Sequence, residues 1–137
     1  MTHQHRRTGA KGGPYRPSRF TLADAFRCAG KGVLYAFSTQ RNMRIHAAAV
    51  AVVAGGALAR IGAVEWVLLA LCIGLVFAAE CANTAIESLI DLVSPDYSEL
   101  AGRAKDCAAG AVLVCSIAAG FVGLIVFVPR ILGMLGF

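Results

Sequence analysis

The feature that most constrains this chain is a run of 22 residues, 107–128, that contains no charged side chain. About 20 residues of helix cross a hydrocarbon core of roughly 30 Å, so this run predicts a transmembrane helix over about 105–129, closed by Pro129. Only 15% of all residues are charged, against roughly 25% in an ordinary soluble domain. The chain is therefore expected to be an all-α membrane protein.

Three further helices are predicted upstream of this run. Residues 64–93 form a second long span whose last half carries several polar residues, and residues 43–60 form a shorter third span. Between 20 and 40, apolar residues recur at three- and four-residue intervals, which is typical of an amphipathic helix lying on the membrane surface. We expect a disordered basic tail over 1–17 and a single membrane domain over 18–137.

The basic residues predict how the chain is oriented. Nine of the 13 Lys and Arg residues lie between Arg6 and Arg44, and the net charge is +5. With three spans, the basic N-terminal region and the segment 103–105 fall on one side, which the positive-inside rule identifies as the cytoplasm. A multi-pass protein of the inner (cytoplasmic) membrane with a cytoplasmic N-terminus is expected. Because long apolar segments follow the basic region, we expect lipid headgroups or a phosphorylated ligand as partners and no nucleic acid.

A stripe of polar residues runs along the predicted span 64–93. At 100° per residue, its five members fall within an arc of 100° on one face of the helix: Glu80, Asn83, Thr84, Glu87 and Asp91. Solvation at a helix end would explain Asp91, but Glu80 follows 14 uncharged residues. A carboxylate at such depth is costly and by default marks a functional site. A purely structural polar seam is the alternative.

The depths of the two glutamates indicate different roles. Partial desolvation raises the proton affinity of Glu80, which suits a general base. Glu87 lies two turns nearer to water, where a divalent cation with its phosphate ligands would arrive. A second polar cluster, GRAKD at 102–106, precedes the last span. It is either a positive-inside anchor or an anion site in which Lys105 assists the amides of a first helical turn.

Four segments together resemble the small integral-membrane prokaryotic diacylglycerol kinases and their relatives, the undecaprenol kinases. They are ECANTAIESLIDLV (80–93), SELAGRAKDCAAGAVL (98–113), AGKG (29–32) and RNMRIH (41–46), and the resemblance extends over about 20–130. The RNMRIH segment is more similar to the undecaprenol kinase branch. The resemblance implies a homotrimer of three-span protomers, each with a surface helix. It also implies Mg²⁺-dependent transfer of the γ-phosphoryl group of ATP to a lipid hydroxyl, on either diacylglycerol or undecaprenol.

The resemblance also implies residue roles. Glu80 corresponds to the general base, Asn83 to its polar neighbour, and Glu87 to a ligand of metal and ATP. One departure is Gln40, which occupies the position of a second metal-binding glutamate; its amide oxygen can coordinate Mg²⁺ but carries no charge. Nucleotide contacts are implied for Glu87 and Gln40 and for seven further residues: Arg27, Lys31, Asp96, Tyr97, Ser98, Lys105 and Asp106.

One function of a different class is also compatible with the polar stripe. A small non-catalytic assembly protein, or an ion-conducting subunit, would use the carboxylates as a seam between protomers. The sequence contains no Walker A loop and no G-x-G-x-x-G motif, so a nucleotide would have to occupy a site particular to this family.

Overall fold

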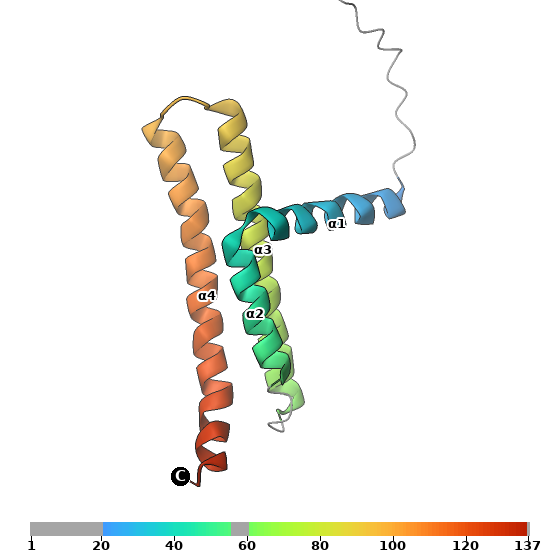
Figure 1. Ribbon diagram of the computed structural model, residues 1–137, viewed down its shortest axis with the longest axis vertical. Helices are drawn as coiled ribbons and strands as arrows, with labels where there is room; N and C mark the ends of the chain where they lie inside the picture. The colour runs from blue at the N-terminus through green and yellow to red at the C-terminus, as the bar shows by residue number, and fades with distance from the viewer. Residues whose placement is uncertain (1–20, 56–60, 137) are drawn as a thin grey trace, which may run out of the picture.

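The computed structural model describes residues 21–55 and 61–136, which form four helices. They are α1 (Leu22–Thr39), α2 (Arg41–Gly55), α3 (Ala63–Val93) and α4 (Glu99–Met134), arranged as Figure 1 shows. No strand occurs within these two ranges, so the prediction of an all-α protein is confirmed there. The predicted tail over 1–17 lies outside the described residues.

α3 and α4 form a long antiparallel hairpin, joined by the short connection 94–98 (Figure 1). Both helices are long and apolar enough to cross a membrane, and no other helix in the described ranges meets both conditions. Apolar residues are buried on both helices, among them Leu69 and Val76 on α3 and Val112 and Val126 on α4. The predicted spans at 64–93 and 105–129 therefore correspond to α3 and to the central part of α4.

α4 extends beyond both of its predicted ends. It begins at Glu99, where the Ser98 hydroxyl accepts a hydrogen bond from the Ala101 amide, and it continues through Pro129 to Met134. The prediction that Pro129 closes the helix is therefore wrong. A proline removes one backbone donor and disturbs the preceding turn. The carbonyl that loses its donor belongs to Ile125, whereas the Arg130 guanidinium donates to the neighbouring Val126 carbonyl oxygen at 2.5 Å.

An ion pair joins α3 and α4 at the end of the hairpin opposite the connection 94–98. The Arg130 Nη2 atom lies 2.5 Å from the Glu65 Oε2 atom, and both side chains are partly buried. Glu65 also accepts a hydrogen bond from the Gly62 amide at the start of α3. The N-terminal end of α3 is thus connected to the C-terminal part of α4.

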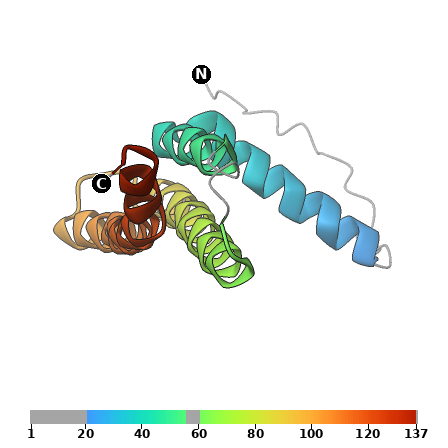
Figure 2. The ribbon, with the colours of Figure 1, turned by 90° about the horizontal axis from the view of Figure 1, so that it is seen from below.

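α2 is the short member of the bundle. Its 15 residues rise about 22 Å, less than the thickness of a hydrocarbon core. It lies alongside α3 in both views (Figures 1 and 2). Residues 56–60 of the predicted span 43–60 lie outside the described ranges. Two membrane-spanning helices are thus supported by length and composition, and the third span stays a prediction.

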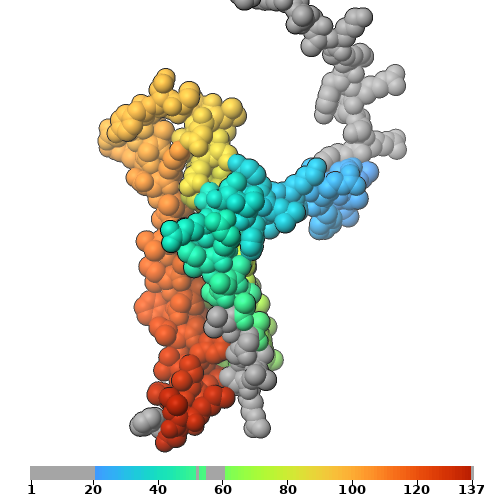
Figure 3. Space-filling model, viewed as in Figure 1, coloured from blue at the N-terminus to red at the C-terminus, as the bar shows by residue number. Residues whose placement is uncertain are grey.

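α1 corresponds to the predicted surface helix at 20–40 and projects sideways from the bundle (Figures 1 and 3). A capping box starts it: the Thr21 hydroxyl and amide both donate to the Asp24 carboxylate, which holds the pKa of Asp24 below its ordinary value. At the other end, Phe37 stacks on Phe77 of α3 with ring centroids 6.4 Å apart. Only this end of α1 therefore approaches the polar stripe of α3.

Candidate functional site

The polar stripe of α3 faces a cavity rather than solvent. Glu80, Asn83 and Thr84 are 1%, 7% and 5% exposed, whereas the Asp91 side chain is 68% exposed. Solvation at a helix end therefore explains Asp91 alone. The cavity has a volume of about 330 Å³ and lies between α2, α3 and α4. Its lining comprises Gln40, Asn42, Ile45, His46, Glu80, Asn83, Glu87, Ala109, Val112, Leu113 and Ser116.

Glu80 has a basic neighbour from α2. The His46 Nε2 atom lies 3.2 Å from the Glu80 Oε1 atom. Their relative orientation does not meet hydrogen-bond geometry, so Oε1 is buried without a hydrogen-bond partner among the described residues. The Asn83 Oδ1 atom is in the same condition. Buried acceptors are normally satisfied, so two open acceptors on one cavity wall indicate a place for a donor such as a hydroxyl group.

Glu87 is held by two amides. The Gln40 Nε2 atom donates to its Oε2 atom at 2.8 Å, and the Asn83 Nδ2 atom donates to its Oε1 atom at 3.0 Å. The carboxylate is therefore fixed in orientation without a cationic partner. The structure thus brings Gln40 and Glu87 together, although they are 47 residues apart in sequence.

The remaining polar member of the stripe, Thr84, has a structural role. Its hydroxyl donates to the Glu80 backbone carbonyl at 2.8 Å, a bond made within the helix. Its single donor is therefore already used, and Thr84 is not among the residues that line the cavity. The candidate chemistry rests on Glu80, Asn83 and Glu87.

The donor set is compatible with a hard divalent cation. Glu87 offers carboxylate oxygens, and Gln40 offers an amide oxygen if its terminal group turns over. Across the described part of the chain, no three His, Cys, Asp or Glu side chains gather as a metal cluster. Mg²⁺ commonly takes only one or two carboxylates from a protein and completes its shell with phosphates and water. The residues therefore fit a site that forms together with a phosphorylated ligand.

Lys105 faces a carboxylate. Its Nζ atom lies 2.5 Å from the Asp91 Oδ1 atom, and this ion pair joins α4 to α3 near the connection 94–98. Because α4 begins at Glu99, Lys105 lies in the second turn, where backbone amides already bond within the helix. Lys105 therefore lies beyond the first-turn amides of α4, and the choice between a positive-inside anchor and an anion site stays a prediction. Asp106 follows it and is exposed.

The other predicted nucleotide contacts lie outside the cavity. Tyr97 in the connection is 96% exposed, and Ser98 uses its hydroxyl to cap α4. On α1, Arg27 pairs with Asp24 at 3.6 Å. Within this chain the structure does not bring these residues to Glu80 and Glu87, and the same holds for the exposed side chains of Lys31 and Asp96.

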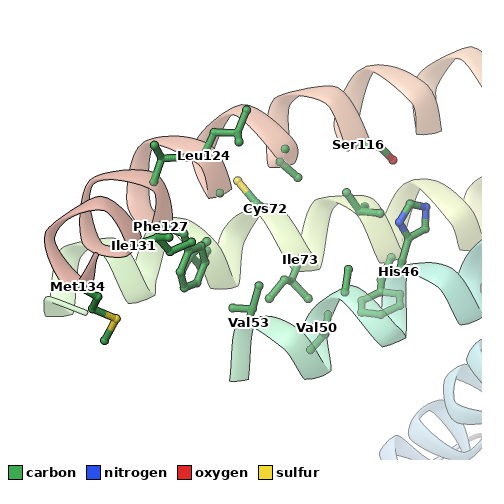
Figure 4. Close-up of a pocket in the computed structure, with 18 residues that line it drawn as sticks. His46, Val50, Val53, Cys72, Ile73, Ser116, Leu124, Phe127, Ile131 and Met134 are labelled. Carbon is green, nitrogen blue, oxygen red and sulfur yellow. The ribbon is translucent and has the colours of Figure 1, made fainter. Parts of the chain in front are cut away.

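An apolar groove continues from the polar cavity along the bundle. Its volume is about 840 Å³, and α2, α3 and α4 line it. Figure 4 shows His46 and Ser116 at one end and Ile131 and Met134 at the other. His46 and Ser116 also line the polar cavity, so the two spaces meet at these side chains.

Sequence reasoning did not select three of the polar residues that line the cavity: Asn42, His46 and Ser116. Asn42 and His46 are four residues apart and so lie on one face of α2. A polar pair at that spacing next to an apolar run was the signal that could have identified them. Ser116 offered no such signal, because a lone serine in an apolar helix usually bonds its own backbone, as its hydroxyl does here to Val112.

Comparison with known proteins gives consistent matches. Residues 27–127 match a family model described as prokaryotic diacylglycerol kinase. A diacylglycerol kinase of Synechocystis sp. is 48% identical over 116 residues, which cover 83% of this chain and 66% of that protein. An undecaprenol kinase of Bacillus subtilis is 41% identical over 108 residues, covering 78% of this chain and 88% of that protein. A diacylglycerol kinase of Escherichia coli is 42% identical over 59 residues, or 43% and 48% of the two chains.

Proposed function

Because the chain belongs to the prokaryotic diacylglycerol kinase family, we propose that it is a membrane lipid kinase that phosphorylates a lipid hydroxyl with ATP. The observation that carries this proposal is the buried, open Oε1 atom of Glu80 where a polar cavity meets an apolar groove. A lipid alcohol has the matching form, with one polar group at the end of apolar chains. The groove would hold the chains and the cavity would hold the hydroxyl.

In the proposed step, Glu80 acts as the general base. It takes the proton of the acceptor hydroxyl while that oxygen forms a bond to the γ-phosphorus of ATP. The bond between the γ-phosphorus and the oxygen bridging to the β-phosphate breaks, and ADP leaves. The Asn83 Oδ1 atom offers a second acceptor that orients the hydroxyl. Such transfers depend mainly on positioning and charge stabilisation, and the buried carboxylate contributes to the positioning.

Glu87 and Gln40 would hold Mg²⁺ in this proposal. When bound, the ion neutralises charge on the β- and γ-phosphates of ATP. The Asn83 amide keeps the Glu87 carboxylate oriented toward the cavity through the hydrogen bond at 3.0 Å. A role for Gln40 requires its amide oxygen, rather than the Nε2 atom that now donates to Glu87, to face the ion.

Cations for the nucleotide must come from outside the cavity, because no Lys or Arg is among its described lining residues. Lys105 is nearest along α4, next to Asp106, and we assign both to ATP binding with the connection residues Asp96, Tyr97 and Ser98. Arg27 and Lys31 lie on α1, which projects away from its own bundle (Figure 1). In a homotrimer such a helix can reach the nucleotide of a neighbouring protomer, which is how we propose that these two residues contribute.

The acceptor and the topology complete the proposal. Diacylglycerol and undecaprenol both present a hydroxyl below apolar chains, and the names of the relatives cover both. We propose three spans, with α2 continuing toward residue 60 as the third, and a cytoplasmic N-terminus in the inner membrane. In that orientation the cavity opens near the cytoplasmic surface, where ATP is available.

The test is a transfer assay with purified protein in vesicles. Radiolabelled ATP, Mg²⁺ and either diacylglycerol or undecaprenol are supplied, and the labelled lipid is measured. Label should enter at least one lipid and should be nearly absent with Glu80→Gln. No label in either lipid would favour a non-catalytic assembly protein or an ion-conducting subunit, in which the carboxylates form a polar seam.

A further inference from the structure

We propose that His46 is a positioning residue for Glu80: it holds the buried carboxylate turned toward the acceptor hydroxyl. The inference rests on the proposed function, since it concerns the efficiency of the base in that reaction. It starts from the 3.2 Å approach of His46 Nε2 to Glu80 Oε1. It gives a role in the reaction to a residue of α2, whose described residues include no Asp or Glu.

Burial makes a partner for Glu80 necessary. The residue is 1% exposed, and a buried carboxylate is unfavourable unless a hydrogen-bond donor or an opposite charge lies beside it. A donor directed at one of its oxygen atoms also restricts how the group turns. Of the described residues that line the cavity, His46 alone has a basic side chain. The orientation of the Glu80 carboxylate therefore depends on His46.

Two open acceptors lie on the cavity wall, Glu80 Oε1 and Asn83 Oδ1, and His46 Nε2 approaches the first of them at 3.2 Å. The titratable groups along the cavity are Glu80 and, two turns away on the same helix, Glu87, which is already held by Gln40 and Asn83. α4 contributes to the cavity only Ala109, Val112, Leu113 and Ser116, none of which titrates near neutral pH. Glu80 is therefore the carboxylate that the His46 ring, whose side chain is 22% exposed, can reach.

The contact between His46 and Glu80 is close but is not a hydrogen bond in this structure. Nε2 is within hydrogen-bond distance, but its N–H is not aligned with Oε1. Rotation about the terminal torsion of the side chain, which is broad for histidine, would align it. Catalytic contacts are often misaligned before substrate binds. Because His46 also lines the apolar groove, a lipid chain that enters the groove would contact the imidazole ring beside Glu80.

The experiment compares His46→Leu, which removes the donor, with His46→Gln, which restores an N–H donor of similar reach. The experiment measures kcat and the KM values for ATP and lipid. Without the donor the carboxylate is no longer held toward the hydroxyl, so His46→Leu should lower kcat roughly tenfold or more while the KM for ATP stays unchanged. His46→Gln should return kcat part of the way. Asn42→Leu is the matched control, since Asn42 lines the same cavity one turn earlier, and its kcat should stay close to that of the parent protein.

A second measurement does not depend on turnover. The nitrogen magnetic resonance signal of His46 Nε2 should change after Glu80→Gln and stay unchanged after Asn42→Leu. An equal loss of kcat in His46→Gln and His46→Leu, or an Nε2 signal that does not respond to Glu80→Gln, would overturn the proposal. If His46→Leu does not fold, His46→Ala with imidazole in the buffer replaces it, and rescue of kcat is the expected result. Failure of the parent protein to label any lipid would instead refute the proposed function.

Discussion

Replacement of Gln40 by glutamate tests whether this residue belongs to a metal site. In the structure Gln40 donates a hydrogen bond to Glu87 at 2.8 Å. Gln40→Glu removes that donor and places two carboxylates in contact. Without a cation the change is unfavourable, whereas with Mg²⁺ it supplies a second charged ligand. The sign of the effect therefore depends on whether a metal binds between these residues.

The magnitude follows from the distances. Two unit charges about 4 Å apart interact by roughly 1 kcal/mol in water and roughly 4 kcal/mol at an effective dielectric constant of 20, and a divalent ion doubles the attraction. Loss of the hydrogen bond to a charged group costs roughly 1.5–3 kcal/mol. Glu87 is partly exposed, so solvent screening reduces the gain. We expect a net gain on the order of 1.4 kcal/mol, which corresponds to a tenfold lower Mg²⁺ requirement.

The assay titrates Mg²⁺ at fixed ATP and compares half-maximal concentrations. Binding of Mn²⁺ without nucleotide, followed by electron paramagnetic resonance, gives a reading independent of turnover. Asn42→Asp is the control, because it adds the same charge elsewhere on the cavity wall. Gln40→Glu should also lower the midpoint of thermal unfolding without a divalent cation and regain it with Mg²⁺. An unchanged or higher Mg²⁺ requirement, or an equal response to Asn42→Asp, would remove Gln40 from the metal site.

Three further changes test other parts of the site. Glu80→Gln should lower turnover by roughly 10²-fold or more at every Mg²⁺ concentration while circular dichroism stays unchanged, and near-normal turnover would refute its role as the base. Lys105→Met should raise the KM for ATP much more than the KM for lipid; Asp91→Asn breaks the same ion pair but keeps the lysine, so an identical ATP defect in both variants would assign Lys105 to structure alone. Gly123→Leu should fill the groove, because a Cβ atom there meets nothing within 4 Å, and so raise the KM for lipid severalfold, whereas Gly74→Leu, outside the groove, should leave it unchanged.

The helices could be predicted because each depends on a local pattern. The run 107–128 and the apolar half of 64–93 are long enough to define α4 and α3. The ends of α4 were less predictable, since its start depends on a Ser98 cap and the helix continues past Pro129 to Met134. A pattern of apolar residues contains neither that cap nor the ion pair of Arg130 with Glu65 next to the proline.

The site was predictable only where it follows one helix. The angular stripe on α3 correctly identified Glu80, Asn83 and Glu87 as neighbours facing a common space. Contacts between helices could not be predicted from the periodicity of one helix. Gln40 and Glu87 form a hydrogen bond across 47 residues of sequence, and the approach of His46 to Glu80 depends on how α2 packs on α3. The resemblance to a family brought Gln40 to notice, but the amide donor that it presents to Glu87 is visible only in the structure.

The pair between Glu65 and Arg130 has a consequence for biogenesis. The two residues are 65 positions apart, so Glu65 leaves the ribosome long before its partner is synthesised. If α3 is inserted with the proposed orientation, its N-terminal end crosses the membrane before this carboxylate has its partner. The hairpin can lock only when the last part of α4 has been translated and inserted. A chain interrupted before Arg130 would therefore present an unpaired acidic end to the quality-control proteases of the membrane, although its site residues had all been made.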